Sequence, residues 1–167
     1  MKAFITVILM LATGLMTAQK EVISQQQIWY KYALKIPLND KWQIRQEIDD
    51  RNFINPARQS QFLTRTHLQC NLGKGWDVAL GFAYFLHSLP QDPEVADFTN
   101  YGELRPSFEI ANLHKISEKF HLHHRYWTEL RYFQQPDDTY TFGTVRIRYK
   151  LELGYDLSEK FSFLVFD

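Results

Sequence analysis

The stretch HHRYWTELRYF, residues 123–133, interleaves a charged file of side chains with a largely apolar one. The two files are Arg125, Trp127, Glu129, Arg131 and Phe133 on one side, and His124, Tyr126, Thr128, Leu130 and Tyr132 on the other. Because successive side chains of a β-strand point to opposite faces, this alternation predicts a strand with two contrasting faces. A soluble sheet would bury the apolar face, whereas a transmembrane barrel would turn it toward lipid.

The same two-residue alternation recurs along the chain and predicts eight strands. Their expected ranges are residues 26–36, 41–53, 60–72, 76–87, 100–115, 119–133, 140–155 and 160–167. Most of these segments are about twice as long as the ~5–6 residues of a usual strand in a soluble protein. They also reach the ~9–11 residues that a tilted strand needs to cross a membrane. The strand lengths therefore favour a membrane barrel.

Four short turns resemble one another, and each is followed by an aromatic residue that opens a strand. They are PLNDKWQI (37–44), NLGKGWDV (71–78), KISEKFHL (115–122) and DLSEKFSF (156–163). Longer polar connections lie between them, at residues 54–60, 88–100 and 134–139. This alternation of short turns and longer loops is typical of an up-and-down antiparallel sheet. We expect an all-β, up-and-down antiparallel transmembrane β-barrel, with the short turns at one end and the longer loops at the other.

The composition excludes several classes of protein. The 167-residue chain has 19 Lys and Arg and 19 Asp and Glu, so its formal net charge is zero. A nucleic-acid-binding protein needs a basic excess. The single cysteine, Cys70, allows no intramolecular disulfide bond. The GKG at residues 73–75 lacks the strand-to-helix context of a phosphate-binding loop. We therefore expect no nucleic-acid partner and no cofactor.

The first segment, MKAFITVILMLATGLMTAQ, combines the positive residue Lys2 with an apolar run over residues 3–15. This run has the length of a signal-peptide core and is too short to span a membrane comfortably. We predict a signal peptide over residues 1–18 and a β-barrel domain over residues 19–167; a membrane anchor is the alternative. The mature protein is expected to leave the cytoplasm and to lie in the outer membrane, with outer-membrane lipid as its partner.

One file of side chains is rich in arginine with acids among the arginines, unlike a usual soluble surface. We assign this file to the barrel lumen as a charge network that comprises Lys31, Arg45, Glu47, Arg65, Glu103, Arg105, Glu109, Arg125, Glu129, Arg131, Arg146, Arg148 and Glu152. Arginine and glutamate within mutual reach neutralise each other in a confined interior. Because interior side chains nearly fill a barrel of about eight to ten strands, we expect the network to form a plug.

Turn lengths predict which side chains face each other within the hairpins. A three-residue loop at 73–75 places Arg65 opposite Ala83 and His67 opposite Gly81. Each of these pairs sets a large side chain against a small one, as a crowded interior requires.

Two further pairings concern charges. The first short turn, at residues 37–41, places Lys31 opposite Glu47. Arg105 and Arg131 are predicted to oppose each other, which is unfavourable for two like charges. Acids nearby on the same face, Glu103 among them, are expected to relieve this repulsion.

The chain resembles the family known as domain of unknown function 2490 in four segments: KWQIRQEIDDR, YGELRPSFEI, HRYWTELRYF and VRIRYKLELGYDLSEKF. The resemblance covers about residues 26–167 and rests on Arg/Glu alternations. It implies a secreted outer-membrane barrel of a Gram-negative bacterium, and it implies no activity. Members of that family are usually longer, and this chain stops about half a strand beyond its last turn. We therefore expect a barrel that lacks one further hairpin and is incomplete at its C-terminus.

Three functional classes remain open: an outer-membrane barrel with a structural, channel or binding role, an outer-membrane lipid-modifying enzyme, and a soluble lipocalin-like ligand carrier. An enzyme could use Ser107, which a turn at 117–119 places opposite Glu129, but no sequence motif supports catalysis. His121 and His123 share a face and could supply half of a metal site, but the spacing gives no third ligand. We favour the first class, with no catalytic residue and no metal site.

Overall fold

The computed structural model describes residues 25–158 and 161–166, which form one antiparallel sheet of eight strands in sequence order. The strands are β1 (Gln27–Pro37), β2 (Trp42–Phe53), β3 (Arg58–Gly73), β4 (Trp76–Leu89), β5 (Thr99–Lys115), β6 (Phe120–Gln134), β7 (Tyr140–Asp156) and β8 (Ser162–Phe166). All eight predicted strands are present. Within the described residues, no helix reaches the length and apolarity needed to cross a membrane. The predicted signal peptide, residues 1–18, lies outside the described residues.

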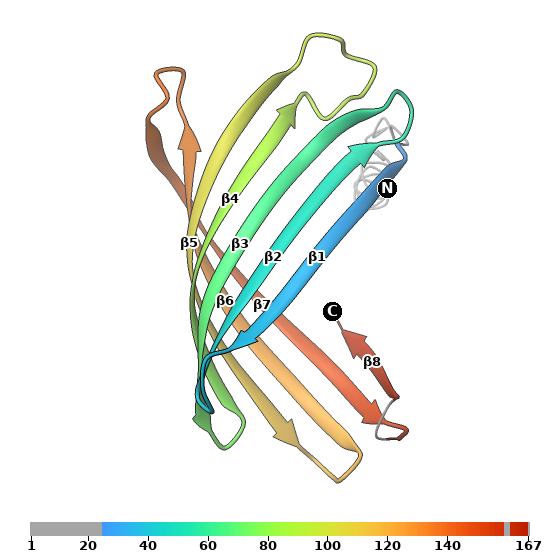
Figure 1. The fold of residues 1–167 in the computed structure, drawn as a ribbon, viewed down its shortest axis with the longest axis vertical. Helices are drawn as coiled ribbons and strands as arrows, with labels where there is room; N and C mark the ends of the chain where they lie inside the picture. Colours follow the sequence, from blue (N-terminus) through green and yellow to red (C-terminus); the bar gives the residue numbers. More distant parts are fainter. Residues whose placement is uncertain (1–24, 159–160, 167) are drawn as a thin grey trace, which may run out of the picture.

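The sheet curls into an open half-barrel, as Figure 1 shows. Among the described strands, β1 pairs only with β2, and β8 pairs only with β7. The two edge strands therefore leave both edges of the sheet without a hydrogen-bonded neighbour. The described strands thus have the up-and-down order of a barrel but form an open sheet.

The short turns lie together at one end of the half-barrel and the longer loops at the other, as predicted (Figure 1). Three of the short turns share one backbone pattern, which explains their related sequences. In the first, the N–H groups of Leu38 and Asn39 donate to the carbonyl of Trp42 over 2.8 and 3.2 Å. Equivalent pairs of bonds reach Phe120 between β5 and β6, and Phe161 between β7 and β8. The aromatic residue therefore closes each of these turns.

The β3–β4 hairpin has the predicted pairing but a shorter turn. Both predicted large-to-small pairs are confirmed, including His67 opposite Gly81. The turn itself holds only residues 74–75. The predicted pairing is kept because a bulge within residues 71–73 adds one extra residue to β3. Gly73 and Gly75 have φ angles of 83° and 80°, a region that glycine enters without steric strain.

The pairing of β1 with β2 differs from the predicted one by two residues. Lys31 lies opposite Asp49 rather than Glu47. The reason is that β1 continues through Pro37, which pairs with Gln43, so the turn begins one residue later than expected. A shift by an even number of residues keeps every side chain on its face. The Lys31 ammonium accordingly remains 3.6 Å from the Glu47 carboxylate, now along a diagonal.

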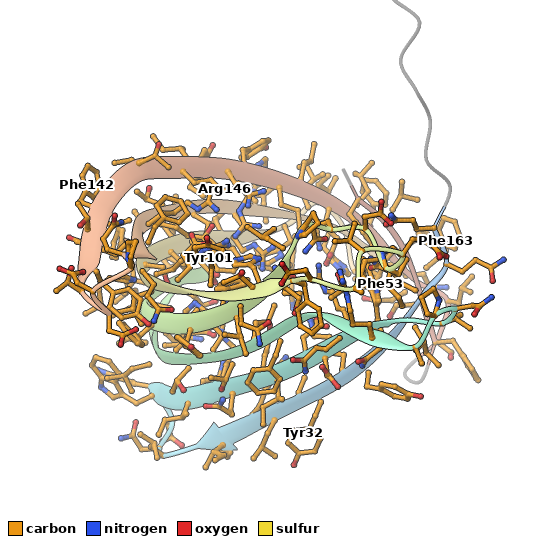
Figure 2. All side chains as sticks on the ribbon, turned by 90° about the horizontal axis from the view of Figure 1, so that it is seen from above. Tyr32, Phe53, Tyr101, Phe142, Arg146 and Phe163 are labelled. Atoms are coloured by element: carbon orange, nitrogen blue, oxygen red, sulfur yellow. The ribbon has the colours of Figure 1, made fainter. Side chains whose placement is uncertain are left out.

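The two files of side chains occupy opposite faces of the curled sheet. The charged file lies on the concave face, where Glu103 and Glu129 have an exposed fraction of 0%. The apolar file lies on the convex face and is exposed, to 75% at Ile147. Figure 2 shows this division, with Tyr32 and Phe142 pointing away from the half-barrel and the charged side chains gathered within it. The usual arrangement of a soluble protein is thus inverted.

Replacing Gly81 by valine is expected to destabilise the fold by about 1–3 kcal/mol, because a side chain there would overpack the concave face. A Cβ atom at this position would overlap with the His67 ring and the Ser107 hydroxyl. Urea unfolding followed by fluorescence measures the effect. The control is Ala33→Val, at an exposed position of β1 on the same face. Equal stability of the two variants would contradict the close packing against Gly81.

Candidate functional site

The most connected group on the concave face is the carboxylate of Glu103 on β5. Arg105, two residues along the same strand, donates to its two oxygens from Nε and Nη2 over 2.7 and 2.8 Å. Arg131 on β6 donates to the same two oxygens, with 3.1 Å from Nη2 to Oε2. The Nε2 atom of His87 on β4 lies 3.0 Å from Oε2. One buried acid therefore binds two guanidinium groups in bidentate fashion, a strong and directional arrangement.

Strand register explains why Glu103 occupies this place. Arg105 and Arg131 face each other across the β5–β6 hairpin. The strand pairing shows this, because Glu103 lies opposite Phe133 on one side of them and Ser107 lies opposite Glu129 on the other. Two like charges in this arrangement repel. The Glu103 carboxylate contacts both and offsets that repulsion.

Glu129 on β6 forms the second buried centre of negative charge. Its Oε2 atom accepts a hydrogen bond of 2.7 Å from Nη2 of Arg148 on β7. Its Oε1 atom lies 3.9 Å from Nη1 of Arg105. Arg105 therefore contacts both carboxylates and links the two groups into one network.

Three further acids form ion pairs elsewhere on the concave face. Glu109 on β5 lies 2.8 Å from Arg45 and 4.0 Å from Arg125. The contact with Arg45 joins β5 to β2, which are not neighbours in the sheet. Glu47 lies 3.2 Å from Arg65 as well as near Lys31. Glu152 accepts a 2.8 Å hydrogen bond from Lys150. The curvature of the sheet makes the long contact between β2 and β5 feasible.

Trp127 on β6 lies at the middle of the arginines, and only 6% of its surface is exposed. The guanidinium carbons of Arg148, Arg65 and Arg125 lie 4.2, 4.5 and 5.1 Å from its ring centroid. Cations at such distances are attracted to the face of an indole. The ring of His67 contacts Trp127 edge-on at 5.6 Å between centroids. A buried tryptophan thus serves as a platform for three arginines from three strands.

Twelve of the thirteen residues assigned to the charge network take part in ion pairs: Lys31, Arg45, Glu47, Arg65, Glu103, Arg105, Glu109, Arg125, Glu129, Arg131, Arg148 and Glu152. Arg146 is the exception, because it is exposed and joins no ion pair among the described residues. Sequence reasoning missed the platform role of Trp127 and the participation of His87. The only signal for Trp127 was its place in the charged file.

The residues considered for catalysis and metal binding are held in other contacts. The Ser107 hydroxyl lies 3.5 Å from Nε2 of His67, but the Glu129 carboxylate is bonded to Arg148 and does not orient that histidine. His121 lies 3.7 Å from Asp156, and His123 lies 4.0 Å from Glu152. Within the described residues, no group of three or more His, Cys, Asp or Glu side chains could hold a metal ion. This geometry is not that of a serine hydrolase.

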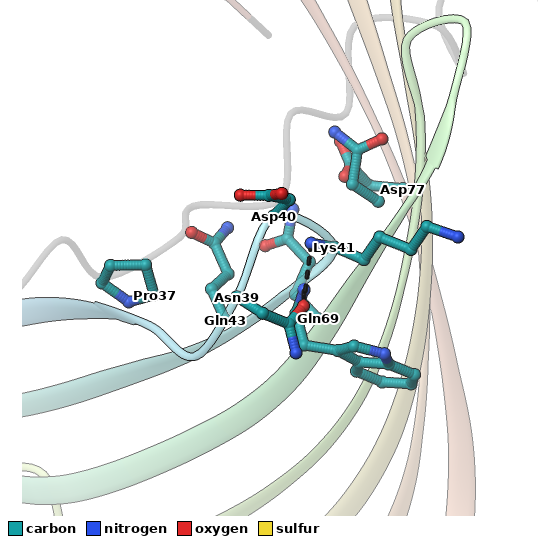
Figure 3. A pocket seen from close by; sticks show the side chains of 9 residues that line it. Pro37, Asn39, Asp40, Lys41, Gln43, Gln69 and Asp77 are labelled. Carbon is teal, nitrogen blue, oxygen red and sulfur yellow. Dashed lines mark hydrogen bonds between the residues drawn. The ribbon is translucent and has the colours of Figure 1, made fainter.

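A small recess of about 130 Å³ lies at the first short turn, between Pro37 and Asp77 (Figure 3). Its central side chain, Asn39, caps the turn. The side-chain Oδ1 atom of Asn39 accepts hydrogen bonds of 2.9 Å from the backbone N–H groups of Lys41 and Trp42. The polar groups here are engaged in shaping the turn, which is the usual role of asparagine in such positions.

Comparisons with known proteins identify a family and nothing more specific. Neither the curated proteins nor the solved structures give a match. Residues 26–167, which contain all eight strands and the whole charge network, match the family described as "Protein of unknown function (DUF2490)". The chain therefore belongs to the DUF2490 family.

Proposed function

We propose that this chain is an exported outer-membrane β-barrel protein whose charged interior binds solutes and does not form an open pore. The inverted distribution of side chains carries the proposal. Ile147, Leu80 and Phe82 on the convex face are 75%, 65% and 50% exposed, whereas the Glu103 and Glu129 carboxylates are buried. In water, a continuous apolar surface of this kind would favour aggregation. In a bilayer, the same surface is the side that contacts lipid.

Polar side chains on the convex face support the proposal because they bond to one another. The Gln46 amide donates to the Thr64 hydroxyl over 2.9 Å and accepts a hydrogen bond from Thr66. Nδ1 of His124 lies 2.7 Å from the Tyr149 hydroxyl. Lipid offers no hydrogen-bond partner, so polar groups at a lipid-facing surface need partners within the protein.

Aromatic residues at both ends of the convex face give further support. Trp42, Trp76, Tyr155 and Phe161 lie near the short turns, and Tyr84, Tyr132 and Phe142 lie toward the longer loops. Tryptophan and tyrosine concentrate where the hydrocarbon core meets the head groups. The apolar band between these two girdles is the part that we propose crosses the membrane.

The proposal includes closure of the sheet and a filled interior. Unpaired backbone groups at the edges of β1 and β8 would be costly in lipid, so a membrane location requires that these edges acquire partners. The concave face carries a dense network of ion pairs around Trp127. Side chains of this size fill most of a small barrel. A binding or structural role is therefore favoured over conduction.

Quenching of tryptophan fluorescence by lipids with brominated acyl chains tests the membrane proposal. Three single-tryptophan proteins, each with the other three tryptophans replaced by phenylalanine, would retain Trp42, Trp76 or Trp127. In vesicles we expect strong quenching of Trp42 and Trp76, which are 40% and 46% exposed, because they lie at the lipid boundary. Trp127 should keep most of its emission.

Vesicles of the same lipid without bromine provide the control. The absence of quenching in all three proteins, or stronger quenching of Trp127 than of Trp42, would refute the membrane location. The soluble ligand carrier would then be the better interpretation.

A further inference from the structure

Two recesses on the concave face differ in how their polar groups are satisfied. The first, of about 260 Å³, lies between His87 and Gln134. There, His87 contacts Gln61 and Glu103, while Gln134 accepts a 2.7 Å hydrogen bond from the backbone N–H of Gly102. These groups already have partners, so this recess offers little to a ligand. The second recess retains donors without partners.

We infer that this second recess, of about 380 Å³, binds the oxyanion group of a small organic anion. It is lined by Arg125, Trp127, Arg148, Tyr149, Lys150 and Phe166, which come from β6, β7 and β8. Arginine presents a planar fork of donors that fits phosphate and carboxylate groups. The recess thus combines three cations with the aromatic rings of Trp127 and Phe166.

The balance of charge favours an anion. The thirteen assigned network residues together with Lys150 comprise nine cations and five carboxylates, although the chain as a whole has a net charge of zero. This network on the concave face therefore carries four more positive than negative charges. Concave surfaces of one sign focus the field and raise the local concentration of the opposite ion.

Unpartnered donors supply a second, independent observation. The Nε1 atom of Trp127 and the Nε atoms of Arg65 and Arg148 are buried and have no hydrogen-bond partner among the described residues. All three donors belong to one cluster, because both arginines contact the Trp127 ring. Buried polar groups are nearly always hydrogen-bonded, so such a cluster calls for an acceptor.

Unpartnered acceptors also occur in this region, but the network already contacts them. They are Oε2 of Glu109 and Oε1 of Glu129, which lie 4.0 and 3.9 Å from Arg125 and Arg105. Neither glutamate lines the recess, whereas Arg125, Arg148 and Lys150 do, so a cation there would be repelled. Trp127 and Arg148, two of the residues with an unpartnered donor, line the recess, so the arrangement favours an anion.

The size of the recess and the residues that line it indicate the chemical class of the ligand more closely. A volume of about 380 Å³ falls within the range of sites for small organic molecules. The Phe166 ring, with the Lys150 ammonium 4.2 Å from its centroid, offers an apolar surface beside the cations. A soluble organic phosphate or carboxylate would use both features, with its oxyanion on the arginines and its organic part against the aromatic rings.

This inference deepens the proposed function and rests on it for the role of the concave face as a barrel interior. Isothermal titration calorimetry on the full chain in a nonionic detergent, at fixed ionic strength, tests the inference directly. The probes are glycerol 3-phosphate, inorganic phosphate and acetate, with glycerol as the neutral control. We expect saturable binding of the anions, tightest for glycerol 3-phosphate, and none of glycerol.

Variants locate the site. Arg148→Gln and Lys150→Gln are each expected to weaken binding about tenfold or more, as expected for the loss of a charge-assisted hydrogen bond. Arg51→Gln is the matched control, because Arg51 lies on the same face but is paired with Asp49 and stacked on Trp29, outside the recess. Circular dichroism verifies that each variant keeps its fold. If Arg148→Gln does not fold, Lys150→Gln still decides the question.

Several outcomes would overturn the inference. These are the absence of saturable anion binding, an equal loss in Arg51→Gln, and binding of phosphatidic acid in mixed micelles that glycerol 3-phosphate cannot displace. The last result would assign the recess to a lipid head group. Because the titration uses micelles and the quenching experiment uses bilayers, failure of anion binding with intact quenching would leave the membrane proposal standing.

Discussion

Replacing Glu103 by glutamine is expected to lower the free energy of unfolding by about 3–5 kcal/mol, the range for breaking a buried ion pair from one side. The Glu103 carboxylate is fully buried and binds both Arg105 and Arg131. Glutamine keeps the shape but removes the charge, and its amide nitrogen cannot accept a hydrogen bond from a guanidinium group. Two arginines would then face each other without a shared acid.

Urea titration of the refolded protein, followed by tryptophan fluorescence, measures this effect. Glu118→Gln is the control, because Glu118 is exposed in the short turn between β5 and β6. The double variant Glu103→Gln with Arg131→Gln should lose less stability than the sum of the losses in the two single variants. The second substitution removes one of the positive charges that the first leaves without a partner. Additive losses, or a Glu103 variant as stable as the control, would show that the network contributes little.

The second large effect is expected from Ile147→Arg, which should destabilise the protein in a bilayer by about 2–4 kcal/mol. Ile147 lies in the middle of β7, opposite Thr128, and is 75% exposed on the convex face. If that face contacts lipid, an arginine there must leave water for hydrocarbon. If the face is in water, the same change removes an exposed apolar side chain and is close to neutral.

Unfolding by urea from lipid vesicles measures the cost of this substitution. The matched control is Ile116→Arg, at a 51% exposed position in the short turn between β5 and β6, where the cost should fall to about 0–1 kcal/mol. A difference between the two positions supports a lipid-facing band. Equal, small effects at both would count against the membrane assignment.

Local sequence rules accounted for most of the fold. Strict alternation predicted the strands and their faces, and turn chemistry predicted where the chain reverses. The β1–β2 register was wrong by two residues, since nothing in the sequence shows whether Pro37 ends the strand or pairs within it. The assignment of side chains to the two faces stayed correct, because the side-chain period of a strand is two and the shift is an even number of residues.

The candidate site was predictable only in part. The alternation of side chains identified the charged residues of the site, and the pairing of neighbouring strands predicted facing residues such as Ser107 and Glu129. The contact of Arg45 with Glu109 was not foreseen, because it joins strands that are not neighbours. The contact of Arg65 with Trp127 was missed for the same reason, since it joins β3 to β6.

The sequence by itself determined the strand order, the two faces and the distribution of charge between them, because these follow from alternation and from short-range turns. Only the tertiary structure decided which charged side chains meet, which donors remain unpartnered around Trp127, and where a recess is left. The physical reason is curvature. Curling the sheet brings side chains from separate strands across the concave face, and the degree of curling depends on the packing of all eight strands together.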